Sequence, residues 1–190
     1  FYKLDDLRSQ KLISAIGISI NRWEPWNGVR AVRTGQIDAV QVIYNIFDQN
    51  PEDELFPACR EMNVAVIARV PFDEGTLTGT LTKDSHWPEG DWGNTYFVPE
   101  NLIPSVERAD AVKKTLDEWN RERSTNITMP ELALRFILGN DDVSTIIPGM
   151  RKLRHVESNT PASDAGPLPP ELQEKMRTFR WVRKPAPWSQ

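Results

Sequence analysis

The sequence predicts an α/β fold built on a parallel β-sheet. Four short apolar runs are separated by segments with helical patterning, and the runs do not alternate cleanly between apolar and polar residues. Runs that are apolar on both faces are typical of buried parallel strands. Strands that alternate with helices at short spacing form βα units, which predict a parallel sheet. The expected strands are Ser14 to Ile18, Ala39 to Ile43, Val64 to Val70 and Val143 to Ile147.

Each expected strand is followed by helical sequence. A short helix is predicted over Pro25 to Arg33, because Gly35 stands where a left-handed cap is needed at its end. Asn50 and Pro51 predict the start of the next helix, since Asn is a favoured N-cap and Pro fits the first turn. A long charged helix is expected over Asn101 to Glu122.

Two more helices are expected toward the end of the chain. Thr128-Met-Pro-Glu131 is a capping box, in which each end residue satisfies a backbone N–H of the other. Apolar residues at helical spacing follow it and give this helix a stripe that can be buried. Leu172, Met176 and Phe179 mark a last helix before a tail that contains Pro and Trp.

The interval from Thr76 to Glu100 is too long for a routine connection. A disordered insertion would explain its length, but its aromatic residues (Trp87, Trp92, Tyr96 and Phe97) favour packing against other side chains. Long loops after the carboxyl ends of strands are where barrel enzymes build their sites. We therefore expect an ordered loop close to a ligand.

The composition restricts the class of protein. At 190 residues, with 39% hydrophobic and 26% charged residues, the chain is typical of one globular domain. A net charge of −4 without a basic stripe argues against a nucleic-acid partner. Cys59 is the single cysteine and His86 and His155 are the only histidines, so neither an internal disulfide nor a metal site is predicted. No apolar run approaches a membrane span and no signal peptide opens the chain, which predicts a soluble, cytoplasmic protein.

The beginning of the chain predicts that the sequence is a fragment. It opens at Phe1 rather than Met, and Leu4, Leu7 and Leu12 resemble the apolar face of a helix that is already under way. We therefore expect the sequence to begin inside a domain. Residues 1–190 are interpreted as one single-domain fragment.

Residues 143 to 159 carry the clearest functional pattern. An apolar strand ends at Pro148-Gly149, and Arg151, Lys152 and Arg154 follow at once. Gly149 permits close backbone approach, and the segment after it is expected to begin a helix. Backbone donors at a helix start, together with guanidinium groups, form a site suited to phosphate. A basic turn that only faces water is the alternative. No Gly-x-Gly-x-x-Gly follows any expected strand, which argues against a Rossmann dinucleotide site.

Four segments, in order along the chain, resemble the aldo/keto reductases at the family's fifth to eighth strands. Because the four matches are collinear and cover essentially the whole chain, the resemblance implies the C-terminal half of a TIM (β/α)₈ barrel, strands 5–8 with their helices. The segments are Ala15-Ile-Gly-Ile-Ser19, Ala39-Val-Gln41-Val-Ile-Tyr-Asn45, Val66-Ile-Ala-Arg-Val-Pro-Phe-Asp-Glu-Gly-Thr-Leu-Thr-Gly79, and Ile147-Pro-Gly-Met-Arg151 with Asn159.

The resemblance implies a binding site for NADP, with NAD less favoured. Ser19 and Gln41 would contact the nicotinamide carboxamide and so fix which face of the ring presents its hydride. Arg151 would pair with the phosphate on the adenosine ribose, and Asn159 would contact the edge of the adenine. For Ser19 and Gln41, the alternative is a polar group that is merely satisfied at the end of a strand.

Further residues are implied at the cofactor by the same resemblance. Arg69 takes the position where many members stack an aromatic ring on the nicotinamide, and a guanidinium plane can also stack on a ring. Pro71, Phe72 and Gly79 belong to the segment that resembles the pyrophosphate loop, while Gly149 precedes the phosphate-binding arginine. Glu74 lies in the same loop, where a carboxylate would repel the ligand unless it points away.

The family's catalytic Asp, Tyr, Lys and His lie on earlier strands, so the chain carries cofactor-half features without a recognisable proton donor. Neither Tyr44 nor Tyr96 has a spacing that would substitute. The resemblance implies the NAD(P)H-binding portion of an oxidoreductase that reduces small aldehydes or ketones to alcohols in the intact protein. We expect the chain to associate with the missing half of the barrel or with itself. The alternatives are a nucleotide-binding module and an interaction subunit similar to the potassium-channel beta subunits, neither of which would need catalysis.

Overall fold

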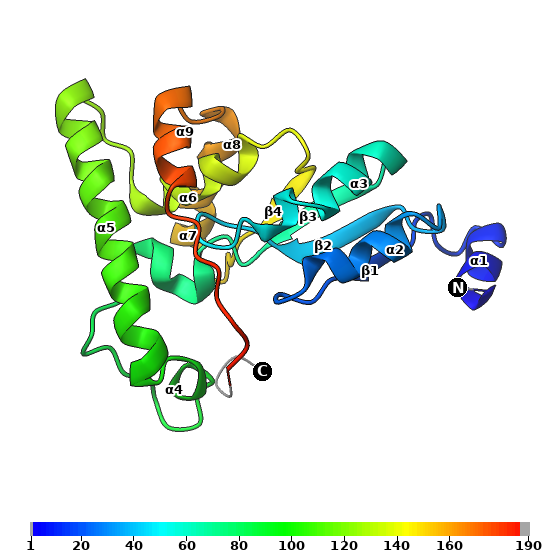
Figure 1. Ribbon diagram of the computed structural model, residues 1–190, viewed down its shortest axis with the longest axis horizontal. Helices are drawn as coiled ribbons and strands as arrows, with labels where there is room; N and C mark the ends of the chain where they lie inside the picture. Colours follow the sequence, from blue (N-terminus) through cyan, green and yellow to red (C-terminus); the bar gives the residue numbers. More distant parts are fainter. Residues whose placement is uncertain (1, 187–190) are drawn as a thin grey trace.

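A computed structural model describes residues 2–186 and shows a four-stranded, fully parallel sheet (Figure 1). β2 and β3 pair over five residues each, whereas β1 and β4 are three-residue strands at the two edges. Among the described residues, each edge strand has one neighbour, so the outer edges of β1 and β4 are unpaired. The strands, in their order across the sheet, are β1 (Gly17–Ser19), β2 (Ala39–Ile43), β3 (Ala65–Arg69) and β4 (Thr145–Ile147).

The first strand is displaced from its predicted position, Ser14 to Ile18. It begins at Gly17, whose partner Ala39 is the first residue of β2. Before this pair, Ile16 meets the turn that precedes β2, because its backbone N–H donates to the Asp38 carboxylate at 2.7 Å. The Ile16 N–H, which would pair with a neighbouring strand if β1 began earlier, is therefore bonded to a carboxylate instead. β1 ends at Ser19, one residue later than expected.

Helices follow every strand, as the sequence predicts. No helix within residues 2–186 is long and apolar enough to cross a membrane. The helical segments are α1 (Tyr2–Ser9), η1 (Pro25–Gly28), α2 (Val29–Val32), η2 (Asn50–Glu52), α3 (Leu55–Met62), η3 (Asp73–Thr78), α4 (Gly93–Tyr96), α5 (Pro99–Arg123), α6 (Met129–Leu138), α7 (Leu153–Asn159), α8 (Pro161–Asp164) and α9 (Pro170–Arg177).

Two of the three predicted helix caps are confirmed. Gly35 follows α2 with a left-handed φ of 68°. The Thr128 hydroxyl accepts a hydrogen bond from the Glu131 N–H at 3.3 Å, which confirms one half of the predicted capping box, whereas the Glu131 carboxylate accepts from Arg135. The predicted Asn50 cap is wrong, because Asn50 lies inside η2 and its side-chain oxygen accepts from Arg180 at 2.8 Å. A contact with the distant tail has replaced the local one.

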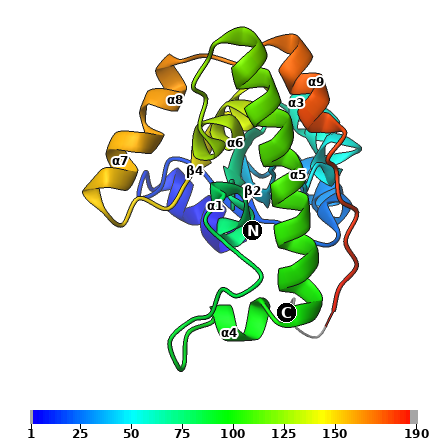
Figure 2. The same ribbon diagram turned by 90° about the vertical axis from the view of Figure 1, so that its left-hand side faces the viewer.

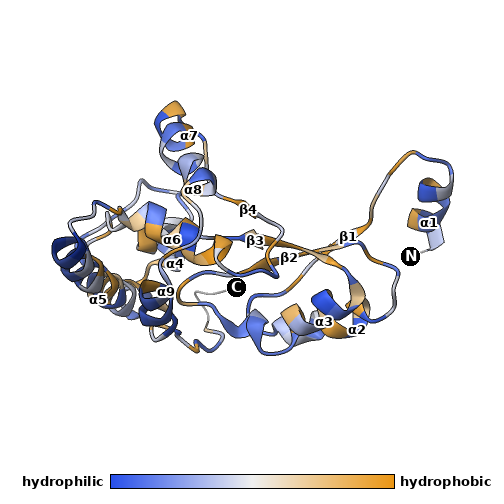
Figure 3. Ribbon diagram, turned by 90° about the horizontal axis from the view of Figure 1, so that it is seen from above, coloured by the Kyte–Doolittle hydropathy of each residue, from blue (hydrophilic) through white to orange (hydrophobic). Residues whose placement is uncertain are grey.

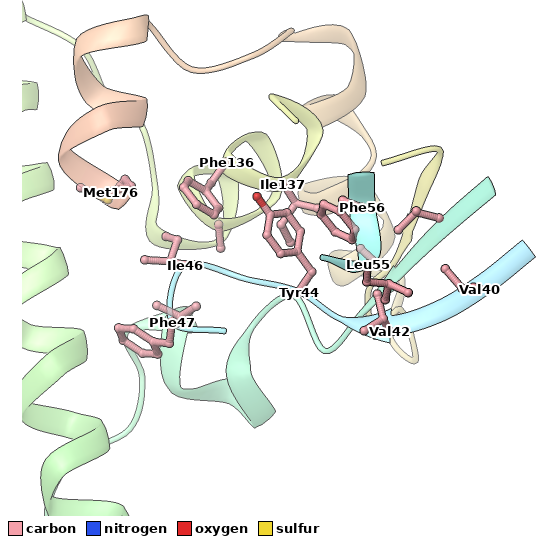
Figure 4. Packing of buried hydrophobic residues seen from close by; sticks show 14 of the residues in the cluster. Val40, Val42, Tyr44, Ile46, Phe47, Leu55, Phe56, Phe136, Ile137 and Met176 are labelled. Atoms are coloured by element: carbon pink, nitrogen blue, oxygen red, sulfur yellow. The ribbon is translucent and has the colours of Figure 1, made fainter. Parts of the chain in front are cut away.

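The sheet is covered by helices on one face. Val40, Val42, Val66 and Ala68 alternate along β2 and β3, are fully buried, and share one core with side chains of α2, α3 and α6. Figure 3 shows α2 and α3 along one side of the sheet, and Figure 4 shows the packing around Tyr44. The intervening residues Ala39 and Gln41 of β2, and Ala65, Ile67 and Arg69 of β3, are only partly buried, whereas Ile43 at the end of β2 is buried. One face of the sheet is therefore open, as expected for half of a barrel.

The long interval after β3 is ordered and packed, as predicted from its aromatic residues. Trp87 stacks on Phe97 with ring centroids 4.8 Å apart, and Trp92 stacks on Tyr96 at 4.6 Å. Tyr96 and Phe97 form a second small core with the first turns of α5. Figure 2 shows α4 at the foot of α5.

Candidate functional site

Ser19 and Gln41 lie side by side on the open face of the sheet. Ser19 ends β1 and is the register partner of Gln41 in β2, which in turn pairs with Ile67 in β3. Because side chains alternate along a strand, register partners in a parallel ladder present their side chains on the same face. Within residues 2–186, neither the Ser19 hydroxyl nor the Gln41 amide makes a hydrogen bond. A shallow depression of about 220 Å³ is lined by all three residues.

Arg69 lies on the same face, two residues beyond Ile67 and nearer the carboxyl end of β3. Its Nη2 donates a long hydrogen bond of 3.4 Å to the Ile20 carbonyl, and its buried Nε has no partner among the described residues. Burial lowers the pKa of Arg69, the negative charge of Glu74 opposes this, and the positive charge of Arg22 lowers it further. The positive charge of Arg69 on the open face is therefore only partly balanced by its neighbours.

The loop after β3 has an unusual backbone. Val70, Asp73 and Glu74 have positive φ values of 56°, 47° and 59°, and Gly75 and Gly79 have φ values of 108° and 72°. Positive φ is common for glycine but uncommon for other residues and costly for a β-branched one. The loop is therefore held in a tightly specified conformation.

Pro71, Phe72 and Gly79 have different surroundings within this loop. Pro71 is buried, and Phe72 packs against the main core. Gly79 is exposed, and an added Cβ would approach the Met129 side chain at 3.3 Å. The first two residues anchor the loop to the core, whereas Gly79 leaves its backbone accessible.

The segment after β4, which the sequence predicts to bind phosphate, has an exposed part and a buried part. Gly149 and Arg151 are exposed, and Arg151 makes no ion pair within the described residues. Asn159 is 7% exposed and lines a cavity of about 210 Å³ together with Pro148 and Met150. The fold thus places Asn159 beside the two residues that flank Gly149. The expected helix begins at Leu153, two residues after Arg151.

A buried cluster of charges at the carboxyl ends of the strands was not predicted from the sequence. Arg22 follows β1, Asp48 follows β2, Asp73 lies in the loop after β3 and Arg183 comes from the C-terminal tail. Up to 135 residues separate the members of one pair. An Arg–Asp pair at helical spacing can be recognised in a sequence, whereas these contacts join distant residues and are visible only once the chain is folded.

Tyr44 and Tyr96 are both buried, and the hydroxyl of each is already hydrogen-bonded to another side chain. Tyr44 is fully buried on the helix-covered side, where its hydroxyl donates to Glu52 and accepts from Asn140. Burial raises the pKa of Tyr96 to about 12, and its hydroxyl accepts a hydrogen bond from Arg22 at 2.6 Å. Among the described residues, no group of three or more His, Cys, Asp or Glu could hold a metal ion.

Comparisons with known proteins agree on one family. The sequence profile described as "Aldo/keto reductase family" matches residues 1–179. The NADH-specific methylglyoxal reductase of Escherichia coli is 30% identical over 161 residues, which are 84% of this chain and 46% of that protein. The aldo-keto reductase yakc of Schizosaccharomyces pombe, whose name specifies NADP(+), is 30% identical over 68% of this chain and 38% of its own length. The chain thus spans less than half the length of these two relatives.

Solved structures of aldo-keto reductases share the fold. The apo form of an aldo-keto reductase from Bacillus halodurans matches 98% of this chain and 58% of its own, with a TM-score of 0.68 and 24% identity. A glycerol dehydrogenase from Gluconobacter oxydans matches 97% of this chain and 55% of its own, with a TM-score of 0.70 and 21% identity. The parallel sheet with its helices matches part of a (β/α)₈ barrel.

Proposed function

Because the chain belongs to the aldo/keto reductase family, we propose that it forms the nicotinamide-nucleotide-binding, C-terminal half of an oxidoreductase barrel. It would supply strands five to eight as β1 to β4. Two unpaired edges and an uncovered face support this proposal, since both features suit a sheet that other strands complete. The remaining half of the barrel would pair with the edges of β1 and β4 and cover Ile67 on the open face.

The register of Ser19 and Gln41 is the observation that carries this proposal. Two neighbouring strands present a hydroxyl and an amide on one face, and neither group has a hydrogen-bond partner within residues 2–186. A carboxamide offers an acceptor oxygen and two N–H donors, and a hydroxyl and an amide can each donate to the one and accept from the other. Arg69, just beyond them on β3, would lie against the nicotinamide ring by stacking.

The preferred cofactor would be NADP, with NAD less favoured. Arg151 is exposed and unpaired among the described residues, which leaves its guanidinium group available for a ribose phosphate. Asn159 would contact the adenine from the cavity that it shares with Pro148 and Met150. Gly149 and Gly79 would permit the close approach of backbone to ligand, and Pro71 and Phe72 would fix the loop that receives the diphosphate.

In the intact protein the bound nucleotide would supply a hydride to a small aldehyde or ketone. This chain would bind and orient the nicotinamide, and the other half of the barrel would supply the proton. A nucleotide-binding module without catalysis is the alternative. The burial of Tyr44 and Tyr96 favours that alternative for the isolated chain, because both hydroxyls already bond other side chains.

A fluorescence titration of the purified chain with NADPH tests the proposal. Gln41→Leu should weaken binding by roughly 2- to 12-fold, the equivalent of one net hydrogen bond. Gln36→Leu is the matched control, because Gln36 is exposed just before the amino end of β2. Adenosine 2′-monophosphate lacks the carboxamide, so its affinity should be the same for all three proteins. If wild-type chain does not bind NADPH, or if both variants lose the same affinity, the proposal is wrong.

A further inference from the structure

Four charged side chains from distant parts of the chain form one closed network. Arg22 Nη2 lies 3.0 Å from Asp48 Oδ2 and 2.8 Å from Asp73 Oδ1. Arg183 Nη2 lies 2.5 Å from Asp48 Oδ2 and 2.7 Å from Asp73 Oδ1. The exposed fractions of the four side chains are 9% for Arg22, 11% for Asp48, 1% for Asp73 and 3% for Arg183. The network is therefore almost completely shielded from water.

The charges of this network are balanced within it. Two guanidinium groups face two carboxylates, and each carboxylate receives both cations. Asn45 adds a neutral donor to Asp48 at 3.1 Å. The charges of Arg22 and Arg183 are already compensated by carboxylates, whereas Arg151 makes no ion pair within residues 2–186. Removing one partner would leave a buried charge without compensation, which is strongly unfavourable.

Asp73 links this network to the strained loop after β3. Its own φ is 47°, and Val70 and Glu74 on either side also have positive φ values. A residue in this conformation is strained and persists only where surrounding structure enforces it. Both arginines donate hydrogen bonds to the Asp73 carboxylate. These bonds hold the strained segment in place at its centre.

The C-terminal tail brings Arg183 to this place. The Trp181 N–H donates to the Phe47 carbonyl at 2.8 Å, and the Trp181 ring lies 4.4 Å from Arg108 and 4.6 Å from Arg183. Figures 1 and 2 show the tail running from α9 beside α5 toward the end that carries α4. The tail is thus fixed to the segment after β2 and to α5 immediately before it reaches the network.

We propose that Arg22 and Arg183 are positioning residues, which hold the loop of residues 70–79, through Asp73, in the shape that receives the diphosphate of the dinucleotide. The inference rests on the proposed function and adds the C-terminal tail to the scaffold of the cofactor site. Neither arginine touches the ligand. The loop keeps its strained backbone because the tail and the segment after β1 meet at one carboxylate.

The test compares Arg183→Gln with Arg180→Gln in the full 190-residue chain. Arg180 is the matched control, since it is also in the tail but pairs with Asp53 outside the network. Two ligands are titrated: NADPH, which contains the diphosphate, and adenosine 2′-monophosphate, which does not. Arg183→Gln should weaken NADPH binding about tenfold, the equivalent of one charge-assisted hydrogen bond to Asp73, and leave the monophosphate affinity unchanged. Arg180→Gln should change neither affinity.

Hydrogen exchange gives a direct readout of the loop. Arg183→Gln should speed exchange of the amides of residues 73–79 relative to the wild type, and Arg180→Gln should not. Arg183→Lys keeps the charge but cannot form the forked pair, so its NADPH affinity should lie between those of the wild type and the Gln variant. If Arg183→Gln does not fold, the Arg183→Lys variant still tests the proposal.

Two outcomes would overturn the inference. One is a wild-type NADPH affinity in both Arg183 variants, and the other is an equal loss for NADPH and the monophosphate, which would indicate a general effect on the fold. Failure of the proposed function is distinct, since in that case the wild-type chain itself would not bind NADPH.

Discussion

Arg151 is the residue through which the chain would distinguish NADPH from NADH. Replacing it with alanine should weaken NADPH binding and leave NADH binding nearly unchanged, because only NADPH carries the ribose phosphate. A hydrogen bond to a charged group contributes about 1.5–3 kcal/mol, which corresponds to roughly 10- to 150-fold. Arg151 is exposed, so solvent screens the pair and the lower end of this range, about tenfold, is expected.

The assay is a parallel titration of the wild type, Arg151→Ala and Arg154→Ala with both nucleotides. Arg154 is an exposed arginine three residues further along, and its Nε bonds His155 within α7, so it serves as the matched control. Arg151 has no ion pair among the described residues, so its removal should leave the melting temperature unchanged. Equal losses for NADPH and NADH in the Arg151 variant would show that this side chain does not read the phosphate.

Three other expectations follow from burial and charge. The open sheet face and the unpaired edges of β1 and β4 should make the isolated chain self-associate or bind a hydrophobic dye and unfold over a broad range; a monodisperse monomer with a cooperative transition would contradict this. Burial, followed by the charge of Asp142, raises the pKa of the Cys59 thiol to about 11, so thiol reagents should label it at neutral pH only after unfolding; rapid labelling of folded protein would show otherwise. Burial alone would raise the pKa of Asp73, but the positive charges of Arg183 and Arg22 outweigh this effect and lower the pKa. The ionised Asp73 therefore contributes its full stabilisation above the unfolded pKa of about 4, and this stabilisation is lost as the pH falls below that value. Asp73→Asn should therefore shift the unfolding profile to lower temperature at pH 7 and lessen its further shift in acid. Equal shifts of the variant and wild-type profiles with pH would show that Asp73 does not make stability depend on pH in this way.

The strands that lie inside the sheet could be predicted from sequence, and an edge strand could not. β2 has its predicted bounds, Ala39 to Ile43, because its apolar run coincides with the five residues that pair with β3, the first three of which also pair with β1. β1 was displaced because the Asp38 carboxylate takes the Ile16 N–H, a contact with no local signature. The Asn50 cap failed for the same reason, since Arg180 reaches its side chain from 130 residues away.

The candidate site divides in a similar way. Ser19, Gln41 and Arg69 were selected through the family resemblance of their segments, and the parallel register places Ser19 beside Gln41 and puts Arg69 on the same face. The Arg22–Asp73 contact could not be selected, since its 51-residue separation leaves no periodic pattern. The strained φ values around Asp73 were also absent from the prediction, because local propensity does not favour positive φ for valine or the acidic residues.

The central claim is that this chain holds a nicotinamide nucleotide and leaves the chemistry to the rest of a barrel. The most direct measurement follows NADPH binding and aldehyde consumption in one sample of the 190-residue chain. We expect saturable binding of NADPH, with no oxidation of it by a simple aldehyde above that of a heat-killed control. Absence of saturable binding, or turnover clearly above that control, would contradict it.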